Sequence, residues 1–437
     1  MNSETPLVSL RDAGVKLIDC VHKTPAAADH GFPYIAIPQL SEGRVDVDSA
    51  RRISEQDMLE WNVKCNPQED DIILSRRCNP GVTAVIPKGF RGSLGQNLVL
   101  LRATDTNLLT PKYLRWVTRG REWWNEVDRF INVGAVFESL KCADIPEFAI
   151  PVPSIPEQRA IAHILGTLDD KIELNRKTNE TLEAMAKALF KSWFVDFDPV
   201  RAKAEDRPTG LPAEISDLFP DSFEDSELGE IPSGWKVAEI DQIINLKKDS
   251  IDPSCAPDEA FDHYSIPAFD SGRYPAKELG SSIKSQKFLV SGEDLLVSKL
   301  NPSTSRVWIP FSASSRRAIS STEFLVCRAL NDVGRAFAYC LACSDSIVEA
   351  MTGLAGGTSN SHQRIRPGDF LALACCTGSE KARSAFAEVA EPLLTKSLAL
   401  RTESKSLSST RDTLLPKLIS GEIRIPDVEK MLEEVGI

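Results

Sequence analysis

Basic, amide and hydroxyl side chains follow a short segment that occurs twice in the chain. Guanidinium and ammonium groups bind phosphate, while amide and guanidinium groups also hydrogen-bond base edges. These side chains are therefore expected to bind double-stranded DNA. For each residue taken alone, a solvated strand edge is the alternative. The first set is Ser75, Arg76, Arg77, Asn79, Lys88, Arg91, Gln96 and Asn97, and the second is Ser298, Lys299, Asn301, Ser303, Arg306, Arg316 and Arg317.

A polar loop that begins with two glycines, residues 356–366, is a second candidate for DNA binding. Such a loop can become ordered when it enters a groove of DNA. Its counterpart in the first half, residues 134–141, is far more apolar, so the two halves are expected to read different sequences. A plain surface loop is the alternative. The candidate residues are Thr358, Asn360, His362, Gln363, Arg364 and Arg366.

Motifs that would indicate catalysis are absent from the sequence. There is no GxxxxGK[ST] phosphate loop, no HExxH zinc site and no GxSxG nucleophile elbow. Cys340 and Cys343 have the spacing of a zinc knuckle, but no second pair accompanies them, which favours structural burial. We therefore expect no catalytic residue, no metal and no cofactor on this chain.

The charge of the chain is unevenly distributed. The net charge is −12, and residues 205–230 carry nine acidic residues against one basic residue, while residues 422–437 carry five against two. Without these two stretches the chain is nearly neutral, so its charge neither supports nor excludes DNA binding. Residues 198–230 also contain several prolines and are expected to form a loosely ordered acidic linker, and residues 422–437 an acidic tail.

The compartment follows from what the sequence lacks. No stretch reaches the roughly 18 apolar residues of a membrane span, and the first residues do not resemble a signal peptide. Ten cysteines in 437 residues do not indicate a disulfide scaffold. We expect a cytoplasmic protein with no membrane partner.

Two halves of the chain repeat each other. Residues 69–87 match residues 293–310, with the same spacing from Asp71 to Ser75 as from Asp294 to Ser298. Short β-branched runs broken by Gly, Pro and Asn predict strands and turns. The length of the chain calls for at least two domains. We expect two mainly β domains of an α+β fold, at residues 1–153 and 231–378.

Each domain is followed by a heptad pattern of apolar residues, which predicts a long helix. The pattern favours two helices, at 154–197 and 379–421, that pair as an antiparallel coiled coil, and an ordinary core face is the alternative. Pro392 suggests that the regular part of the second helix begins there. The heptad positions are Ile161, Leu168, Asn175, Leu182 and Leu189 in the first helix and Phe386, Leu393, Leu400, Leu407 and Leu414 in the second.

Aromatic residues are clustered at two places in the first half of the chain. Trp116, Trp123 and Trp124 alternate with arginines in a pattern typical of an amphipathic helix, which favours core packing over base stacking. Trp193, Phe194 and Phe197 have no evident partner in the sequence, so they are expected to form an exposed apolar surface that a partner protein covers.

Four segments resemble the DNA specificity subunits of type I restriction-modification systems. They are PSIPEQRAIA at 153–162, FKSWFVDFDPV at 190–200, IPSGW at 231–235 and LLPKLISGEI at 414–423. The resemblance implies a non-catalytic subunit whose two domains each read half of a split, asymmetric DNA site. It also implies two methyltransferase subunits and restriction subunits as partners, with S-adenosylmethionine, ATP and Mg on those partners. A coiled-coil adaptor that does not bind DNA and a stand-alone DNA-modifying enzyme are the alternatives.

Overall fold

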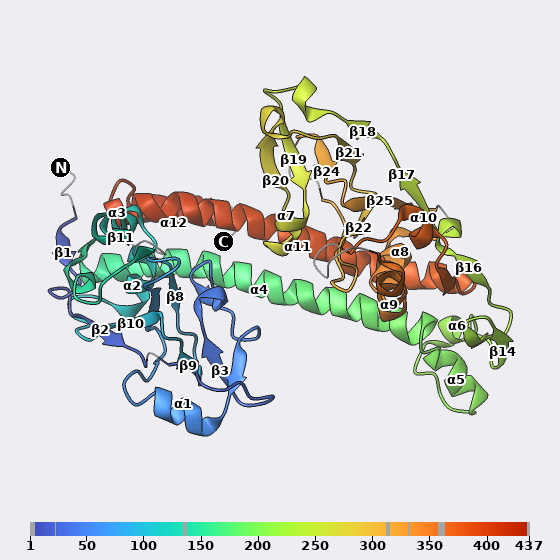
Figure 1. The fold of residues 1–437 in the computed structure, drawn as a ribbon, viewed down its shortest axis with the longest axis horizontal. Coiled ribbons are helices and arrows are strands. Elements are labelled where there is room, and N and C mark those ends of the chain that lie inside the picture. Colours follow the sequence, from blue (N-terminus) through green and yellow to red (C-terminus); the bar gives the residue numbers. More distant parts are fainter. Residues whose placement is uncertain are drawn as a thin grey trace. The chain divides into compact units, whose positions relative to one another are not determined.

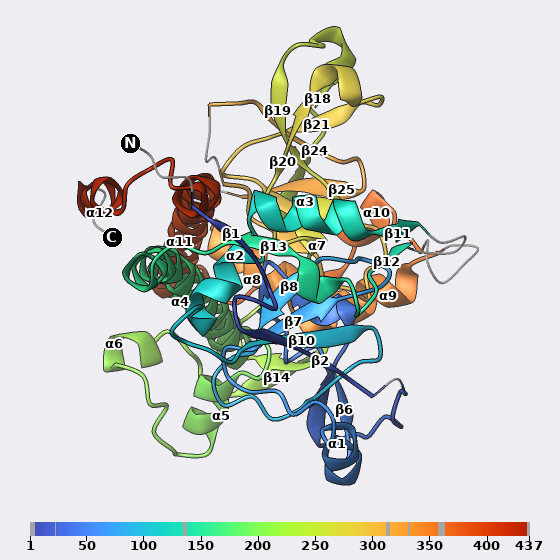
Figure 2. The ribbon, with the colours of Figure 1, turned by 90° about the vertical axis from the view of Figure 1, so that its left-hand side faces the viewer.

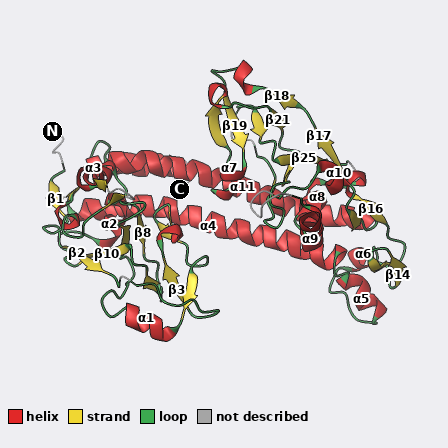
Figure 3. Ribbon diagram, viewed as in Figure 1, coloured by secondary structure: helices red, strands yellow, loops and turns green. Residues whose placement is uncertain are grey.

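The computed structural model describes residues 5–21, 23–133, 138–311, 315–330, 333–356 and 363–434. It divides into two compact units, which are Met1–Glu173 with Lys405–Ile437, and Leu174–Ser404. Two long helices, α4 (Ile155–Phe194) and α11 (Glu380–Ser420), contribute residues to both units. Figures 1 and 3 show these helices and the sheets of each unit. The expected α+β class, with a long helix after each of two domains, is confirmed.

The first unit is built on an antiparallel four-stranded sheet of order β2-β10-β7-β8. A three-stranded sheet β6-β3-β9 and the pair β1-β13 accompany it. Figure 2 shows β1, β2, β7, β8, β10 and β13 after the ribbon is turned by 90° from the view of Figure 1. The elements are β1 (Leu7–Ser9), β2 (Val15–Asp19), β3 (Phe32–Ile35), β4 (Leu40–Ser41), β5 (Arg44–Val45), β6 (Arg51–Ile53), α1 (Glu55–Trp61), β7 (Ile72–Ser75), β8 (Thr83–Val85), β9 (Ser93–Leu94), β10 (Leu98–Ala103), α2 (Pro111–Val117), α3 (Arg121–Phe130), β11 (Asn132–Val133), β12 (Glu138–Ser139) and β13 (Ala149–Pro151).

The second unit repeats this plan with the sheet β17-β25-β22-β23, a five-stranded sheet β18-β21-β24-β19-β20 and the pair β16-β26. Its elements are β16 (Val237–Glu239), β17 (Ile244–Lys247), β18 (Ser250–Ile251), β19 (Ala260–Tyr264), α7 (Ile266–Asp270), β20 (Ala276–Leu279), β21 (Lys287–Val290), β22 (Leu295–Ser298), β23 (Val307–Trp308), β24 (Ala318–Ser320), β25 (Phe324–Ala329), α8 (Arg335–Ala342), α9 (Asp345–Leu354), α10 (Pro367–Leu371) and β26 (Ala374–Cys376).

The sequence repeat corresponds to a repeated buried ion pair. Nε of Arg102 on β10 donates to Asp71 over 2.7 Å, and Nε of Arg328 on β25 donates to Asp294 over 2.9 Å. Both aspartates are almost fully buried immediately before β7 and β22. A buried carboxylate needs a cation and hydrogen-bond donors. The pair therefore joins the two central strands of the main sheet at the same place in each unit.

The pairing of α4 with α11 is antiparallel. In the second unit, Nδ2 of Asn175 donates to Glu403 over 2.9 Å, and Oγ of Ser397 donates to Glu183 over 3.3 Å. As residue numbers rise along α4, the residues contacted on α11 fall in number. In the first unit, Nη1 of Arg411 donates to Asp169 over 2.6 Å, so the two helices also meet there.

The heptad positions lie mostly in the interior. Among the predicted packing residues, Leu182, Leu189 and Leu393 are only partly buried. Asn175 is buried and its amide is satisfied by Glu403 on the facing helix, which is how a polar residue fixes the register of paired helices. The buried positions are Ile161, Leu168, Asn175, Phe386, Leu400, Leu407 and Leu414.

The second long helix, expected at 379–421, is observed as α11 from Glu380 to Ser420, but the expectation that its regular part begins only at Pro392 is wrong, because the helix continues through this proline. Proline removes one backbone N–H and leaves the carbonyl of the residue four positions earlier without its donor. That residue is Glu388, and both it and Pro392 are exposed, so water can bind the carbonyl. Phe386 and Ala390 on the other face are buried in the core and hold the first turns of the helix in place.

The linker is folded, which corrects the expectation of loose order. It forms α5 (Asp198–Ala204), α6 (Ala213–Ser216) and a hairpin of β14 (Phe223–Ser226) and β15 (Gly229–Pro232). Phe219 is buried, and its ring centroid lies 5.2 Å from that of Trp193. The few apolar residues between the acidic ones are thus sufficient to anchor the segment.

The same packing corrects the expected exposed aromatic surface. Trp193, Phe194 and Phe197 are buried in the core of the second unit, where Phe194 and Phe197 contact Trp235. Their partners come from the linker and from the second domain, far along the chain. Within the predicted acidic tail, residues 425–434 form α12 (Ile425–Glu434), whose Val428 is buried in the core of the first unit.

We expect the pairing of the long helices to weaken in acid. Burial alone would raise the pKa of Asp169, but Arg115, Arg44 and Arg411 outweigh it and hold this pKa below its usual value. The stabilising contribution of such a carboxylate is complete above the unfolded pKa of about 4 and is lost as the pH falls through the lower folded value. Thermal unfolding followed from pH 7 to pH 3 should show this loss.

The variant Asp169→Asn tests the cause. It should be less stable at pH 7 by about 3–5 kcal/mol, because the buried guanidinium of Arg411 loses its buried partner and is left with the exposed carboxylate of Asp412. It should also lose less of its remaining stability between pH 5 and pH 3 than the wild type does. Glu180→Gln is the control, because this exposed residue of α4 pairs only with the exposed Arg176 at one turn's distance. Parallel pH curves for wild type and Asp169→Asn would contradict the assignment.

Candidate nucleic-acid interface

A serine hydroxyl closes the turn after the central strand in each unit. Oγ of Ser75 donates to the carbonyl of Arg77 over 3.1 Å, and Oγ of Ser298 donates to the carbonyl of Leu300 over 3.0 Å. One residue in each turn has a positive φ, +64° at Cys78 and +48° at Asn301. Ser75 and Ser298 are both buried. These two serines therefore shape the turns that carry the candidate residues.

The second candidate segment lies against the turn in each unit. In the first unit, the backbone N–H of Leu140 donates to the carbonyl of Arg76 over 2.8 Å. In the second, the N–H of Ile365 donates to the carbonyl of Lys299 over 3.1 Å, and Asn301 and Gln363 exchange two hydrogen bonds. Backbone bonds thus bring together two segments that are more than 60 residues apart in sequence.

We call these paired segments the reading platforms. The first platform consists of residues 76–80 and 138–141, and the second consists of residues 299–303 and 363–366. Of the candidate residues in the polar loop, Gln363, Arg364 and Arg366 belong to the second platform. Thr358, Asn360 and His362 lie outside the described residues.

On the first platform, Arg76 differs from its neighbours. It is 8% exposed, and Nη1 of its guanidinium donates to the carbonyl of Leu140 over 3.3 Å. Arg77 and Asn79 are exposed. Arg76 therefore ties the two segments of the platform together, whereas Arg77 and Asn79 are placed to meet a ligand.

The remaining candidates of the first unit lie at three places. Gln96 and Asn97 line a cavity of about 360 Å³ with Arg51, and the carbonyl of Asn97 accepts a hydrogen bond from the N–H of Arg76 over 2.9 Å, so this cavity adjoins the first platform. Arg91 is exposed and stacks on the ring of Phe32 at 4.9 Å. Lys88 lines a separate groove.

The groove at Lys88 has a volume of about 870 Å³ and is lined by Lys, Arg and His side chains that the sequence did not suggest as a group. Lys112 at the start of α2, with Arg159 and His163 on the first turns of α4, lines it together with Lys88. The carboxylates Glu69, Asp70 and Asp170 line it too. No sequence motif unites these residues, because they come from separate elements.

The arginines of the second set are paired with carboxylates. Arg306 pairs with Asp270 at 2.7 Å, Arg316 with Asp262 at 2.7 Å, and Arg364 with Glu323 at 2.9 Å, while Arg317 pairs with Glu259. An arginine in such a pair must exchange its carboxylate for phosphate before it can bind DNA. Ser303 and Arg366 are exposed, and Lys299 and Gln363 are partly exposed.

The tryptophans of the amphipathic segment belong mainly to the core, as expected. Trp116 and Trp123 are fully buried, and Trp124 is 39% exposed. Arg115 and Arg119 lie over the ring of Trp116 at 4.8 and 5.1 Å. Burial lowers the pKa of the Arg119 guanidinium to about 10. These arginines serve the interior of the first unit.

The described residues also show whether the chain could hold a metal ion or cross a membrane. In the part of the chain that the structure describes, no three His, Cys, Asp or Glu residues are grouped so as to hold a metal ion. Cys340 is buried, and burial raises the pKa of its thiol above the usual value. None of the described helices has the length and apolar character needed to cross a membrane.

Comparison with known proteins agrees with this architecture. Residues 21–184 match the family described as the type I restriction modification DNA specificity domain. Over these residues the chain is similar to the type I restriction specificity subunits. The matched region contains the first platform and the first part of α4.

Curated relatives align over most of the length of this chain. The type I restriction enzyme MjaIX specificity subunit of Methanocaldococcus jannaschii is 25% identical over 402 residues, covering 86% of this chain and 83% of that protein. The HindI specificity subunit of Haemophilus influenzae is 26% identical over 375 residues, covering 73% and 79%. The crystal structure of the S subunit of a type I restriction-modification system from M. genitalium shares the fold, with a TM-score of 0.56, 15% identity and coverage of 95% and 96%.

We expect Arg76 and Asn79 to respond differently to truncation. Arg76→Ala should lower the free energy of unfolding by about 1–3 kcal/mol, because it removes a buried guanidinium and the hydrogen bond to the carbonyl of Leu140. Asn79→Ala should change it by less than about 0.5 kcal/mol, because this residue is exposed. Denaturant unfolding of the two purified variants measures both values. Equal losses would contradict the structural role of Arg76.

Proposed function

We propose that this specificity subunit reads a split, asymmetric DNA site, with one reading platform for each half. The single observation that carries the proposal is the duplication of the platform on one backbone plan. Each copy has a turn closed by serine and a second segment bonded to it, on equivalent strands. A chain that reads one continuous site does not need two such platforms.

Different side chains on the two platforms support different half-sites. The turn of the first platform carries Arg77 and Asn79. The turn of the second platform has Leu300 and Pro302 at the corresponding positions. The second platform instead presents Gln363 and Arg366 from its other segment. Arginine pairs best with guanine and asparagine or glutamine with adenine. An unchanged backbone with exchanged side chains gives two domains of different specificity.

The subunit is further proposed to act within a larger complex. Its partners are two methyltransferase subunits, which bind S-adenosylmethionine, and restriction subunits, which use ATP and Mg. The support for this is the similarity to the type I restriction specificity subunits. The long helices α4 and α11 are proposed to set the number of unspecified base pairs between the half-sites.

The experiment for DNA reading compares the two platforms. The double variant Arg77→Ala with Asn79→Ala should lose discrimination at one half-site by about 1–3 kcal/mol for each bidentate base contact removed. Its matched control is Gln363→Ala with Arg366→Ala, which should affect only the other half-site. Selection of bound sites from a random duplex library, with the methyltransferase subunits present, measures both.

Two results would count against this assignment. Equal loss at both half-sites would indicate a shared phosphate contact in place of base reading. Absence of wild-type binding to DNA even at low salt would favour an adaptor that does not bind DNA, because affinity that depends on phosphate contacts rises as the salt concentration falls.

A matched deletion of one heptad tests the role of the helices. Removing residues 171–177 and 403–409 keeps Asp169 with Arg411 and Glu183 with Arg401, and seven residues return each helix to the same face. The deletion shortens each helix by about 10 Å at 1.5 Å per residue, which corresponds to about three base pairs.

We expect this deletion variant either to prefer a shorter gap between unchanged half-sites or to lose binding, because three base pairs also rotate the DNA by roughly 100°. The same selection from a random library reports the gap. A control that removes residues 171–177 alone should unpair the helices and unfold the protein. Retained binding with the original gap would exclude the helices as the spacing element.

A further inference from the structure

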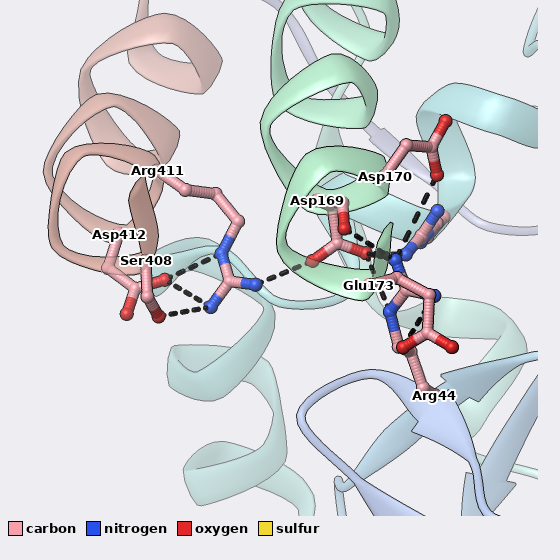
Figure 4. A network of polar contacts seen from close by, with 8 residues as sticks. Arg44, Asp169, Asp170, Glu173, Ser408, Arg411 and Asp412 are labelled. Carbon is pink, nitrogen blue, oxygen red and sulfur yellow. Dashed lines mark hydrogen bonds and ion pairs between the residues drawn. The ribbon is translucent and has the colours of Figure 1, made fainter. Parts of the chain in front are cut away.

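A carboxylate of α4 lies at the centre of a group of cations in the first unit. Nε of Arg44 donates to Oδ2 of Asp169 over 3.0 Å, and Nη1 of Arg411 donates to its Oδ1 over 2.6 Å. Arg115 also pairs with this carboxylate. Figure 4 shows Asp169 between Arg44 and Arg411, with the neighbouring Asp170 and Glu173. The side chain of Asp169 is 1% exposed. One buried acid thus holds three arginines.

A second carboxylate of α4 has the same surroundings in the second unit. Nη1 of Arg273 donates to Oε2 of Glu183 over 3.1 Å, and Arg401 pairs with Oε1. The hydroxyl of Tyr339 donates to the same carboxylate over 3.3 Å. Ser397 on α11 completes the group.

The two groups join corresponding elements. Arg44 and Arg273 are the arginines of a Gly-Arg pair that is repeated in the two domains. The glycine of each pair, Gly43 or Gly272, has a positive φ. Arg115 lies on α2 and Tyr339 on α8, which are equivalent helices of the two domains. The remaining cation of each group, Arg411 or Arg401, comes from α11. Each acid therefore touches a domain turn, a domain helix and the opposite long helix.

We propose that Asp169 and Glu183 are positioning residues, each of which fixes the orientation of its own domain on the paired helices and thereby the direction in which the reading platform faces. This inference rests on the proposed function. We name the two groups the first clasp (Asp169, Arg44, Arg115, Arg411) and the second clasp (Glu183, Arg273, Tyr339, Arg401).

Physical chemistry favours an orienting role over a merely stabilising one. Burying an ion pair costs desolvation, and apolar residues of the same volume often stabilise a protein as much or more. Apolar contacts, however, tolerate sliding and rotation, whereas a carboxylate that accepts hydrogen bonds from several elements is satisfied at one geometry only. In the first clasp, Arg44 also donates to the backbone carbonyl of Asp169 over 2.8 Å, which fixes the domain turn to the helix main chain as well.

The two clasps do not follow the symmetry of the repeat. The acid comes from α4 and the arginine from α11 in both units, although the two helices correspond to each other in the duplicated sequence. The clasps therefore also discriminate α4 from α11. Each domain binds one acidic residue of α4, which in turn pairs with one arginine of α11.

Arg44→Gln tests the first clasp while leaving Asp169 paired with Arg115 and Arg411. In the full chain with methyltransferase subunits, we expect the bases preferred at both half-sites to be unchanged. We expect the range of accepted gap lengths to widen by at least one base pair, and affinity for the best gap to fall about tenfold. Arg273→Gln is the matched variant for the second clasp. Selection from duplex libraries with randomised gaps gives the bases and the gap profile together.

A measurement without DNA separates this inference from the proposed function. Hydrogen exchange of the full chain should show faster exchange in residues 40–45 for Arg44→Gln and in residues 271–274 for Arg273→Gln, with no change at the other turn. This exchange measurement does not depend on DNA binding. If the wild type binds no specific site, the proposed function is overturned, but the exchange result still tests whether the clasps hold the two turns. An unchanged gap profile, with affinity lowered equally at every gap length, would mean that Arg44 only stabilises the fold and would overturn the clasp proposal.

Discussion

Buried carboxylates must meet cations, and in this chain that requirement determines where strands, domains and helices join. Asp71 and Asp294 each bind an arginine of the neighbouring central strand. Asp169 binds three arginines, and Glu183 binds two arginines and the hydroxyl of Tyr339, in each case from three elements. Because an unpaired buried charge costs several kcal/mol, these contacts leave few alternative arrangements of the elements that carry them. The apolar cores then fill the space that the charged contacts define.

The reading platforms show how a duplicated fold can acquire two specificities. The hydroxyl of the repeated serine and the backbone bonds between the two segments preserve the shape of each platform. None of these bonds requires a particular side chain at the exposed positions. The exposed residues are therefore able to change without loss of the scaffold. Arg76 shows the limit of this freedom, because its guanidinium is used inside the first platform.

The paired helices combine apolar and polar contacts for different purposes. Apolar heptad residues such as Leu168 and Leu407 contribute burial, which is insensitive to small shifts along the helix. Asn175 with Glu403, and the acids with their arginines, are satisfied only in one register. Similarity to the type I restriction specificity subunits and the continuous helices support the proposal that this register is transmitted to the DNA as a fixed gap.

The sequence by itself determined the features that depend on local pattern. The repeat around Asp71 and Asp294 predicted two related domains, and the heptad spacing predicted the long helices, because both patterns recur at fixed intervals along the chain. The motifs at 153–162 and 414–423 were specific enough to indicate the family. The burial of Trp116 and Trp123 also followed from local amphipathic spacing.

Only the tertiary structure decided which distant residues meet. It placed Arg76 inside the first platform, buried the aromatic residues 193–197 against the folded linker, and carried α11 through Pro392. It also brought Arg44, Asp169 and Arg411 together from three separate parts of the chain. The reason is physical. The sequence shows that a buried charge or aromatic ring needs a partner, but it does not show which residue that partner is. The partner is decided by packing between segments whose separation in sequence carries no information about their distance in space.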